Sequence, residues 1–254
     1  MLKTTEIIQT KSFKLAIYAK GSVNSEKMAV ILLGKLDTKD YSHSQKLVEF
    51  LADRGYFALS FDPPGTWESG DNIELYTTSN YIKAVNEVID YYENKPTVLI
   101  GHSKGGAMAM VVGCKNPSIT HIISMMSSGK VRIHSKEGEE TGNHTMTDKF
   151  RVHNRDTPLG YENKFQVFKV PKTMFEDKDQ FDLFNILSEC KKPKLFIAGL
   201  KDTSVKKEDV QKLYDVSANP KFIQIIDSIH GYRRNDSSIV EVNNIIWKFL
   251  SNQL

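Results

Sequence analysis

The chain has 254 residues, of which 40% are hydrophobic and 26% are charged, and its formal net charge is +3. This composition excludes a disordered chain, which would hold fewer apolar residues and a more one-sided charge. The small positive excess does not indicate a nucleic-acid partner, and two cysteines, Cys114 and Cys190, are too few for a disulfide framework.

The first 20 residues lack the continuous apolar core of a signal peptide, and no window reaches 18 consecutive apolar residues. We therefore expect a cytoplasmic protein without a membrane span. A length near 250 residues falls within the range of one large α/β domain. We accordingly expect residues 1–254 to form a single domain.

The N-terminal segment predicts an antiparallel hairpin, because apolar residues alternate with other residues from Phe13 to Ala19. Apolar runs further along the chain predict more strands, and the first of these runs is continuous enough for a strand buried on both faces. Between these strands, apolar residues at helical spacing predict helices. The predicted strands are 28–33, 56–61, 97–101, 119–126, 194–198 and 222–226, and the predicted helices include 81–92, 107–114, 206–216 and 239–250. This alternation indicates an α/β fold with a mostly parallel central sheet flanked by helices.

The alternation of strands and helices stops at Ser127. From there to about Lys169 the chain is polar and shows little periodicity, and a weak helix after Pro171 leads back to the next strand. A stretch of this length inside a compact domain is typical of a functional lid or a disordered segment. We interpret residues of about 127–185 as a short, lid-like insert. Its histidines, His134, His144 and His153, match no metal-ligand spacing, so we predict solvated loop residues and no metal site.

The segment Gly101-His-Ser-Lys-Gly105 matches the pattern G-x-S-x-G between a predicted buried strand and a predicted helix. A serine on a tight strand-to-helix turn has a strained backbone, so its neighbours must be small. The glycines two residues before and after Ser103 meet this requirement, and Gly106 adds room. The helix N-terminus behind the serine would also stabilise developing negative charge. Ser103 is therefore the candidate nucleophile.

A nucleophilic serine needs a base, and the base needs a carboxylate that orients it. Asp202 and His230 each follow a predicted strand, at the edge where open parallel sheets bind ligands. We predict that they are the acid and the base. The structural alternatives are a turn or capping role for Asp202 and an ordinary loop position for His230. Asp227 is a second candidate acid, but it lies too near His230 in the sequence to occupy the neighbouring strand end.

In such a site, two backbone N–H groups bind the tetrahedral oxyanion. One belongs to Lys104, the residue after the nucleophile, and the other to the loop after the strand 28–33, where Lys35 is the first choice and Leu36 the next. The Lys35 side chain either faces the pocket, where its charge would suit an acidic or polar substrate, or extends into solvent. The candidate pocket residues are Leu36, Trp67 and His102.

These segments together resemble the α/β-hydrolase superfamily, and most closely its small single-domain esterases of the cinnamoyl-esterase-like and dienelactone-hydrolase-like kinds. Gly101-His-Ser-Lys-Gly-Gly106, Gly199-Leu-Lys-Asp202 and His230-Gly231 look like the nucleophile, acid and histidine motifs of that family, and Leu59–Ser69 looks like its strand and turn before the second helix. The resemblance implies ester or related acyl hydrolysis without a cofactor. One departure is Leu33-Gly34-Lys35, where the family usually has His-Gly.

The first functional hypothesis is a serine hydrolase that cleaves a small carboxylic ester or thioester through an acyl-enzyme. The same site could cleave an amide or peptide bond. The second hypothesis is a hydrolase-fold protein that binds a small ligand without turnover, since the fold does not fix the function. We expect a small-molecule ester as the partner, and a monomer or homodimer.

Overall fold

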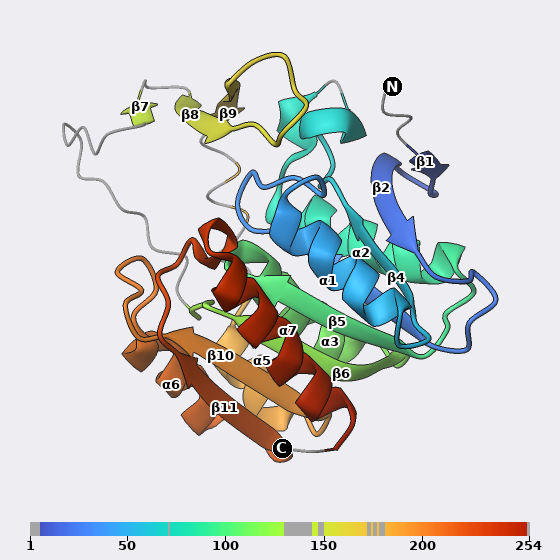
Figure 1. The fold of residues 1–254 in the computed structure, drawn as a ribbon, viewed down its shortest axis with the longest axis vertical. Helices are drawn as coiled ribbons and strands as arrows, with labels where there is room; N and C mark the ends of the chain where they lie inside the picture. The colour runs from blue at the N-terminus through green and yellow to red at the C-terminus, as the bar shows by residue number, and fades with distance from the viewer. Residues whose placement is uncertain are drawn as a thin grey trace.

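The structure is a computed structural model that describes residues 6–70, 72–129, 144–146, 150–171, 174, 177 and 181–252. Its centre is an eight-stranded sheet with the strand order β1-β2-β4-β3-β5-β6-β10-β11 (Figure 1). The strands are β1 (Glu6–Gln9), β2 (Lys14–Lys20), β3 (Met28–Leu32), β4 (Phe57–Phe61), β5 (Thr97–His102), β6 (Ile119–Met125), β10 (Lys194–Gly199) and β11 (Lys221–Ile226). The six strands from β4 to β11 are mutually parallel, and β1 and β2 form the antiparallel hairpin at one edge.

Helices cover both faces of this sheet. They are α1 (Ser42–Ala52), α2 (Thr78–Tyr91), α3 (Lys104–Lys115), α5 (Leu183–Glu189), α6 (Lys207–Val216) and α7 (Asp236–Leu250). In Figure 1, α1 and α7 lie in front of the sheet, and α3 and α5 lie behind it. The predicted α/β fold with its antiparallel N-terminal hairpin is thus confirmed. None of the helices in the described ranges is both long and apolar enough to cross a membrane.

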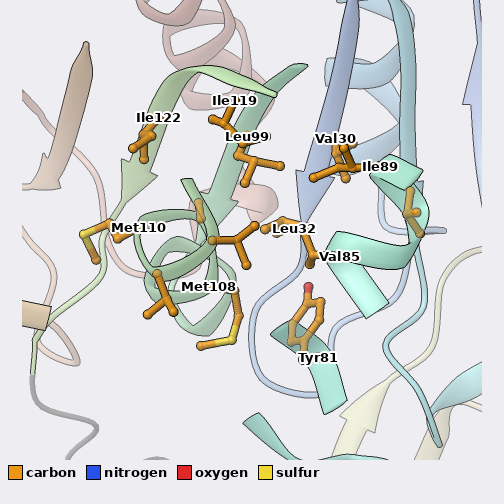
Figure 2. Close-up of a cluster of buried hydrophobic side chains, with 14 of the residues drawn as sticks. Val30, Leu32, Tyr81, Val85, Ile89, Leu99, Met108, Met110, Ile119 and Ile122 are labelled. Atoms are coloured by element: carbon orange, nitrogen blue, oxygen red, sulfur yellow. The ribbon is translucent and has the colours of Figure 1, made fainter. Parts of the chain in front are cut away.

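The continuous apolar run of β3 has a simple cause. Met28, Val30 and Leu32 face the core that contains α2 and α3, whereas Ala29 and Ile31 face the core that contains α1 and α7. Both sets of side chains are buried, so every position of the strand must be apolar. Figure 2 shows the first of these cores, in which side chains of β3, β5 and β6 meet those of α2 and α3.

The parallel strands bring their carboxyl ends to one edge of the sheet. Residues 33–37 follow β3, Asp62 follows β4 and Ser103 follows β5 at this edge. Asp202 follows β10 and His230 follows β11. Segments that are up to 197 residues apart in the sequence therefore converge here, as is usual for ligand sites in open α/β sheets.

The polar stretch after β6 differs from its prediction. Instead of lacking secondary structure, it contributes an antiparallel sheet of β7 (His144–Met146), β8 (Phe150–Asp156) and β9 (Phe165–Pro171). The periodicity was too weak to predict these strands because β8 is polar along most of its length and only His153 in it is fully buried. His153 is therefore not a solvated loop residue, and His134 lies outside the described residues.

A third, smaller core joins this second sheet to the rest of the molecule. Phe168 and Val170 of β9 pack with Leu36 of the loop after β3 and with Tyr76. Trp67, in the short helix η1 (Trp67–Ser69), packs against the same cluster. The insert thus rests on the loops at the carboxyl edge of the main sheet.

Candidate active site

Ser103 occupies the sharp turn between β5 and α3. Its backbone has φ 53° and ψ −117°, a positive φ that is uncommon for a residue with a side chain. The turn is held by a 2.9 Å hydrogen bond from the Ser103 N–H to the carbonyl of Met125 in the neighbouring strand. It places the serine hydroxyl at the carboxyl edge of the sheet, with the N-terminus of α3 directly behind it.

Two glycines make this turn possible. A Cβ atom on Gly101 would lie 2.1 Å from the carbonyl oxygen of Gly105, and a Cβ atom on Gly105 would lie 2.2 Å from the carbonyl oxygen of Leu32. Both contacts are with backbone atoms and cannot be relieved by rotating a side chain. The spacing of the two glycines therefore reflects how closely α3 approaches β3 and β5.

His230 connects Ser103 to Asp202. Its Nε2 atom lies 3.0 Å from Ser103 Oγ, and its Nδ1 atom lies 2.7 Å from Asp202 Oδ2. A carboxylate accepts, so Nδ1 carries the proton and Nε2 is left to accept the serine hydroxyl proton. This is the relationship that a serine nucleophile, its base and an orienting acid require.

The surroundings of Asp202 hold its carboxyl group in one position. The side chain is completely buried, and its other oxygen, Oδ1, accepts 2.8 Å hydrogen bonds from the N–H groups of Ser204 and Val205. The alternative acid, Asp227, instead forms a 2.8 Å ion pair with Lys201, and both side chains are well exposed. The structure thus brings Asp202 to the histidine and leaves Asp227 at the surface.

His102 lies behind His230 in a buried position. Its Nε2 atom is 3.0 Å from the backbone carbonyl of His230, which can only accept, so Nε2 of His102 donates. Its Nδ1 atom has no hydrogen-bond partner within the part of the chain that the structure describes. Burial holds the pKa of His102 well below its usual value, and the neighbouring His230 and His43 act in the same direction. His102 is therefore neutral near pH 7 and supports the backbone of His230.

The loop after β3 is fixed by hydrogen bonds at three of its peptides. The Leu33 N–H donates to the Tyr81 hydroxyl at 2.7 Å, and the Leu36 N–H donates to the Tyr76 hydroxyl at 2.9 Å. The Asp37 N–H donates to the carbonyl of Gly34 at 3.2 Å. Leu36 itself has φ 56°. Because Tyr76 already binds the Leu36 N–H, Lys35 is the better candidate of the two for an oxyanion donor.

The two lysines of the candidate oxyanion site are both half-buried. The ammonium group of Lys104 lies 4.2 Å from the centre of the Tyr76 ring, a distance typical of a cation–π contact. Tyr76 therefore contacts both segments, through its hydroxyl on Leu36 and through its ring on Lys104. The structure places the two predicted donor segments beside one tyrosine.

The predicted pocket residues Leu36 and Trp67 lie between this loop and the insert. Leu36 is buried in the third core, and its carbonyl accepts a 3.0 Å hydrogen bond from the indole N–H of Trp67. The Trp67 ring meets the rings of Tyr161 and Phe168 edge-on, with centroids 6.0 and 5.3 Å apart. Trp67 is only partly buried, so it joins the loop to the insert while keeping some contact with solvent.

Sequence reasoning missed two residues of β8 that reach the site loops. Arg155 donates to the carbonyls of Lys35 and Leu36 and lies 2.5 Å from the carboxylate of Asp37. Its neighbour Asp156 accepts two hydrogen bonds, of 2.9 and 2.6 Å, from Arg233. Both lie in the polar stretch without periodicity, and no sequence motif marks either of them.

A buried charge cluster supports the outer side of the same loops. The ammonium group of Lys39 lies 3.0 Å from Asp40 and 3.6 Å from Asp62, and it also contacts Glu68. Burial raises the pKa of Asp62 to about 6, although Lys39 acts in the opposite direction. Within the described ranges there is no group of three or more His, Cys, Asp or Glu side chains arranged to hold a metal ion.

Comparison with known proteins agrees with the fold described above. The model of the alpha/beta hydrolase fold family matches residues 30–174. The structure is similar to that of Est1E from Butyrivibrio proteoclasticus with ferulic acid bound, with a TM-score of 0.76, 18% identity and coverage of 98% of each chain. It is also similar to the esterase Pf2001 from Pyrococcus furiosus, with a TM-score of 0.71, 20% identity and coverage of 98% of this chain and 91% of that one. At these identities the likeness concerns the fold.

One curated relative matches part of the chain. A 2-hydroxy-6-oxononadienedioate/2-hydroxy-6-oxononatrienedioate hydrolase from Pseudomonas sp is 27% identical over 117 residues, which make up 46% of this chain. The match spans 41% of that hydrolase, so the chain corresponds to about two fifths of the length of this relative.

Proposed function

The chain belongs to the alpha/beta hydrolase fold family, and from this premise we propose that it is a serine hydrolase that cleaves a small carboxylic ester or thioester. The observation that carries the proposal is the hydrogen-bonded chain from Ser103 through His230 to Asp202, with distances of 3.0 and 2.7 Å. It begins at a strained turn on the ligand-binding edge of the sheet.

In the proposed acylation, the Ser103 hydroxyl oxygen attacks the carbonyl carbon of the substrate. Nε2 of His230 takes the hydroxyl proton as the C–O bond forms, and then gives it to the leaving alcohol or thiol. Asp202 keeps the other ring nitrogen protonated and stabilises the positive charge of the imidazolium. Its two hydrogen bonds from Ser204 and Val205 hold it in place during this step.

The negative charge that develops on the carbonyl oxygen needs N–H donors placed in advance. We propose the backbone N–H groups of Lys104 and Lys35 for this role. Lys104 is the first residue of α3, so the helix dipole adds to the same stabilisation. The hydrogen bonds of Tyr81 and Tyr76 on either side of Lys35 would hold its peptide in one orientation.

In the proposed deacylation, water takes the place of Ser103 as the nucleophile. A water molecule attacks the acyl-enzyme, His230 takes its proton, and the carboxylic acid leaves as the proton returns to Ser103. Every step uses side chains and backbone groups of this chain, so we propose a reaction without a cofactor.

The names of the similar proteins favour esters. Est1E was solved with ferulic acid, and Pf2001 is named an esterase. Among the residues beside the site, Trp67 and Tyr161 present aromatic rings where the insert meets the loop after β3. We therefore propose a small ester whose acyl group contacts this aromatic side of the site, with the strands β8 and β9 of the insert forming one wall.

A fluorophosphonate probe tests the proposal directly. The wild-type protein is expected to be labelled on one serine, and Ser103→Ala is expected to remove the labelling while the fold is retained. Ser127→Ala provides a matched control, because Ser127 is also a buried serine at the carboxyl edge but makes no hydrogen bond to His230 within the described part of the chain. Labelling that persists in Ser103→Ala would overturn the proposal.

A panel of p-nitrophenyl esters with increasing acyl length, together with matched thioesters and anilides, would then define the substrate. Preference for the anilides would favour amide cleavage by the same site. A folded wild-type protein that neither reacts with the probe nor hydrolyses any substrate would favour the binding-protein alternative.

A further inference from the structure

One end of β8 contacts two separate loops of the candidate active site. The consecutive residues Arg155 and Asp156 end this strand and have different partners. Arg155 reaches the loop after β3, and Asp156 reaches Arg233, three residues beyond His230. The insert therefore contacts both the loop after β3 and the segment that follows His230.

The contacts of Arg155 determine how the loop after β3 is oriented. Its guanidinium group donates to the carbonyls of Lys35 and Leu36 and pairs with the carboxylate of Asp37. Asp37 in turn donates its N–H to the carbonyl of Gly34. The N–H of Lys35 belongs to the same peptide as that carbonyl and points the opposite way, because the peptide is planar and trans. Arg155 thus fixes the Lys35 N–H through Asp37.

Arg155 also balances a charge beside the site. The side chain of Asp37 is 6% exposed, so its carboxylate is largely desolvated and needs a partner. Arg155 supplies a positive charge at 2.5 Å. If that charge were removed, the unpaired carboxylate would lie on the same loop as the proposed oxyanion donor and would oppose the negative transition state.

Asp156 performs the corresponding task on the histidine side. It accepts both hydrogen bonds of the Arg233 guanidinium, whose carbon atom also lies 4.0 Å above the Tyr41 ring. The Tyr41 hydroxyl donates to the Asp156 carbonyl at 2.6 Å. A bidentate pair of this kind restricts orientation as well as distance. It connects β8 to the segment that carries His230.

We propose that Arg155 and Asp156 are positioning residues of the hydrolytic site: Arg155 orients the oxyanion loop, and Asp156, through Arg233, orients the loop of His230. The insert then contributes to the chemical step as well as covering the site. This inference rests on the proposed function, because it assigns roles within that reaction.

The test compares steady-state kinetics of Arg155→Lys, Arg155→Met and Asp156→Asn on a p-nitrophenyl ester. We expect kcat to fall by about 10- to 100-fold with KM changed less than about threefold, since misplacing a reacting group by about 1 Å can cost about 100-fold. Arg155→Lys keeps the charge but cannot bind two carbonyls and a carboxylate together, so we expect it to recover only part of the activity.

A second readout separates positioning from stability. A trifluoromethyl ketone forms a tetrahedral adduct with the serine, so its inhibition constant should rise in parallel with the fall of kcat/KM in the Arg155 variants. Thermal unfolding shows whether each variant is folded at the assay temperature. Exposed neighbours serve as matched controls: Asn154→Ala on the same strand and Arg234→Gln beside Arg233 should leave kcat unchanged.

The outcomes distinguish this inference from the proposed function. Wild-type activity that depends on Ser103, together with unchanged kcat in folded Arg155→Met and Asp156→Asn, would overturn the positioning roles alone. An equal fall of kcat in the exposed controls would also overturn them. If the wild-type protein shows no serine-dependent reaction, the proposed function fails and the positioning roles fall with it.

Discussion

The Oδ2 atom of Asp202 lies 2.7 Å from Nδ1 of His230, whereas the carboxylate of Asp227, only three residues before that histidine, pairs with Lys201 at the surface. Proximity in the sequence thus does not decide which acid meets the base. Asp202 reaches it because β10 and β11 are parallel neighbours in register, so the loops that follow them start at the same level.

We predict that Asp202→Asn lowers kcat by about 10⁴-fold with little change in KM, because an amide can donate to the ring and favour the wrong tautomer. Asp227→Asn breaks only an exposed ion pair and should retain full activity. Both variants are measured on one p-nitrophenyl ester. Loss of activity in Asp227→Asn, with Asp202→Asn active, would contradict the assignment.

The close packing of the serine turn gives a prediction about stability. Gly105→Ala would place Cβ 2.2 Å from a backbone carbonyl oxygen, so we expect loss of the native fold or a large drop in the midpoint of thermal unfolding. Gly231→Ala is the matched control beside the other reactive residue. Gly231 has φ −85°, and a Cβ atom there would meet its nearest heavy atom, on Arg234, at 4.0 Å. Equal unfolding temperatures for the two variants would contradict this account.

His102 offers a third prediction. His102→Phe keeps a ring in the buried site but removes the donor that binds the carbonyl of His230. An unsatisfied buried carbonyl costs about 1–3 kcal/mol, and we expect the free energy of unfolding to fall by this amount. The loosened His230 should also lower kcat by about 10-fold. His102→Gln can still donate, so recovery of both quantities in that variant would support the hydrogen bond, and equal losses in both variants would contradict it.

The buried His43 predicts how stability depends on pH. Burial lowers the pKa of His43 to about 4, with Arg233 acting in the same direction and Asp37 in the opposite one. The unfolded chain binds a proton near pH 6.5 and the folded chain does not, so this group stabilises the fold fully above pH 6.5 and loses that contribution as the pH falls toward 4. The neighbouring His102, whose pKa is also lowered, acts with the same sign.

His43→Phe removes one of these titrations and keeps the edge-on contact with Tyr232. Between pH 7.5 and 4.5, we expect the variant to lose about 2–3 kcal/mol less unfolding free energy than the wild type. Chemical denaturation at the two pH values measures this difference. The buried Asp62, whose pKa is raised to about 6, contributes with the opposite sign but is present in both proteins and cancels in the comparison. Parallel stability curves would contradict the prediction.

Those parts of the molecule were predictable from the sequence in which the backbone or the packing tolerates only a few residue types. Gly101 and Gly105 cannot carry a Cβ, so the turn around Ser103 is marked by its composition. The strand β3, which is buried on both faces, is marked by an unbroken apolar run, and β4 by a run that only Ser60 interrupts. Asp202 could be placed because it follows the buried strand β10, and His230 because it follows the predicted strand that became β11. Their roles as acid and base remain proposals.

The insert could not be predicted in the same way. Its strand β8 is mostly polar, so it lacks the alternation that marks a strand with one buried face. Arg155 and Asp37 are 118 residues apart in the sequence, and Asp156 and Arg233 are 77 apart. An arginine or aspartate accepts many partners, so neither residue type indicates which distant loop it will meet. The hydrogen bonds of Tyr76 and Tyr81 to the loop after β3 were missed for the same reason.

Ser103, Asp202 and His230 all lie outside residues 127–185, on segments that belong to the main sheet. A protein engineer would therefore regard the insert as a cassette that can be exchanged to change substrate range. The end of β8 limits that freedom, because Asp37 and Arg233 stay behind when the cassette is removed. A chimera that receives a foreign insert without an arginine and an aspartate at the matching positions would leave a buried carboxylate and a half-buried guanidinium without their partners. Such grafts should carry this dipeptide with them.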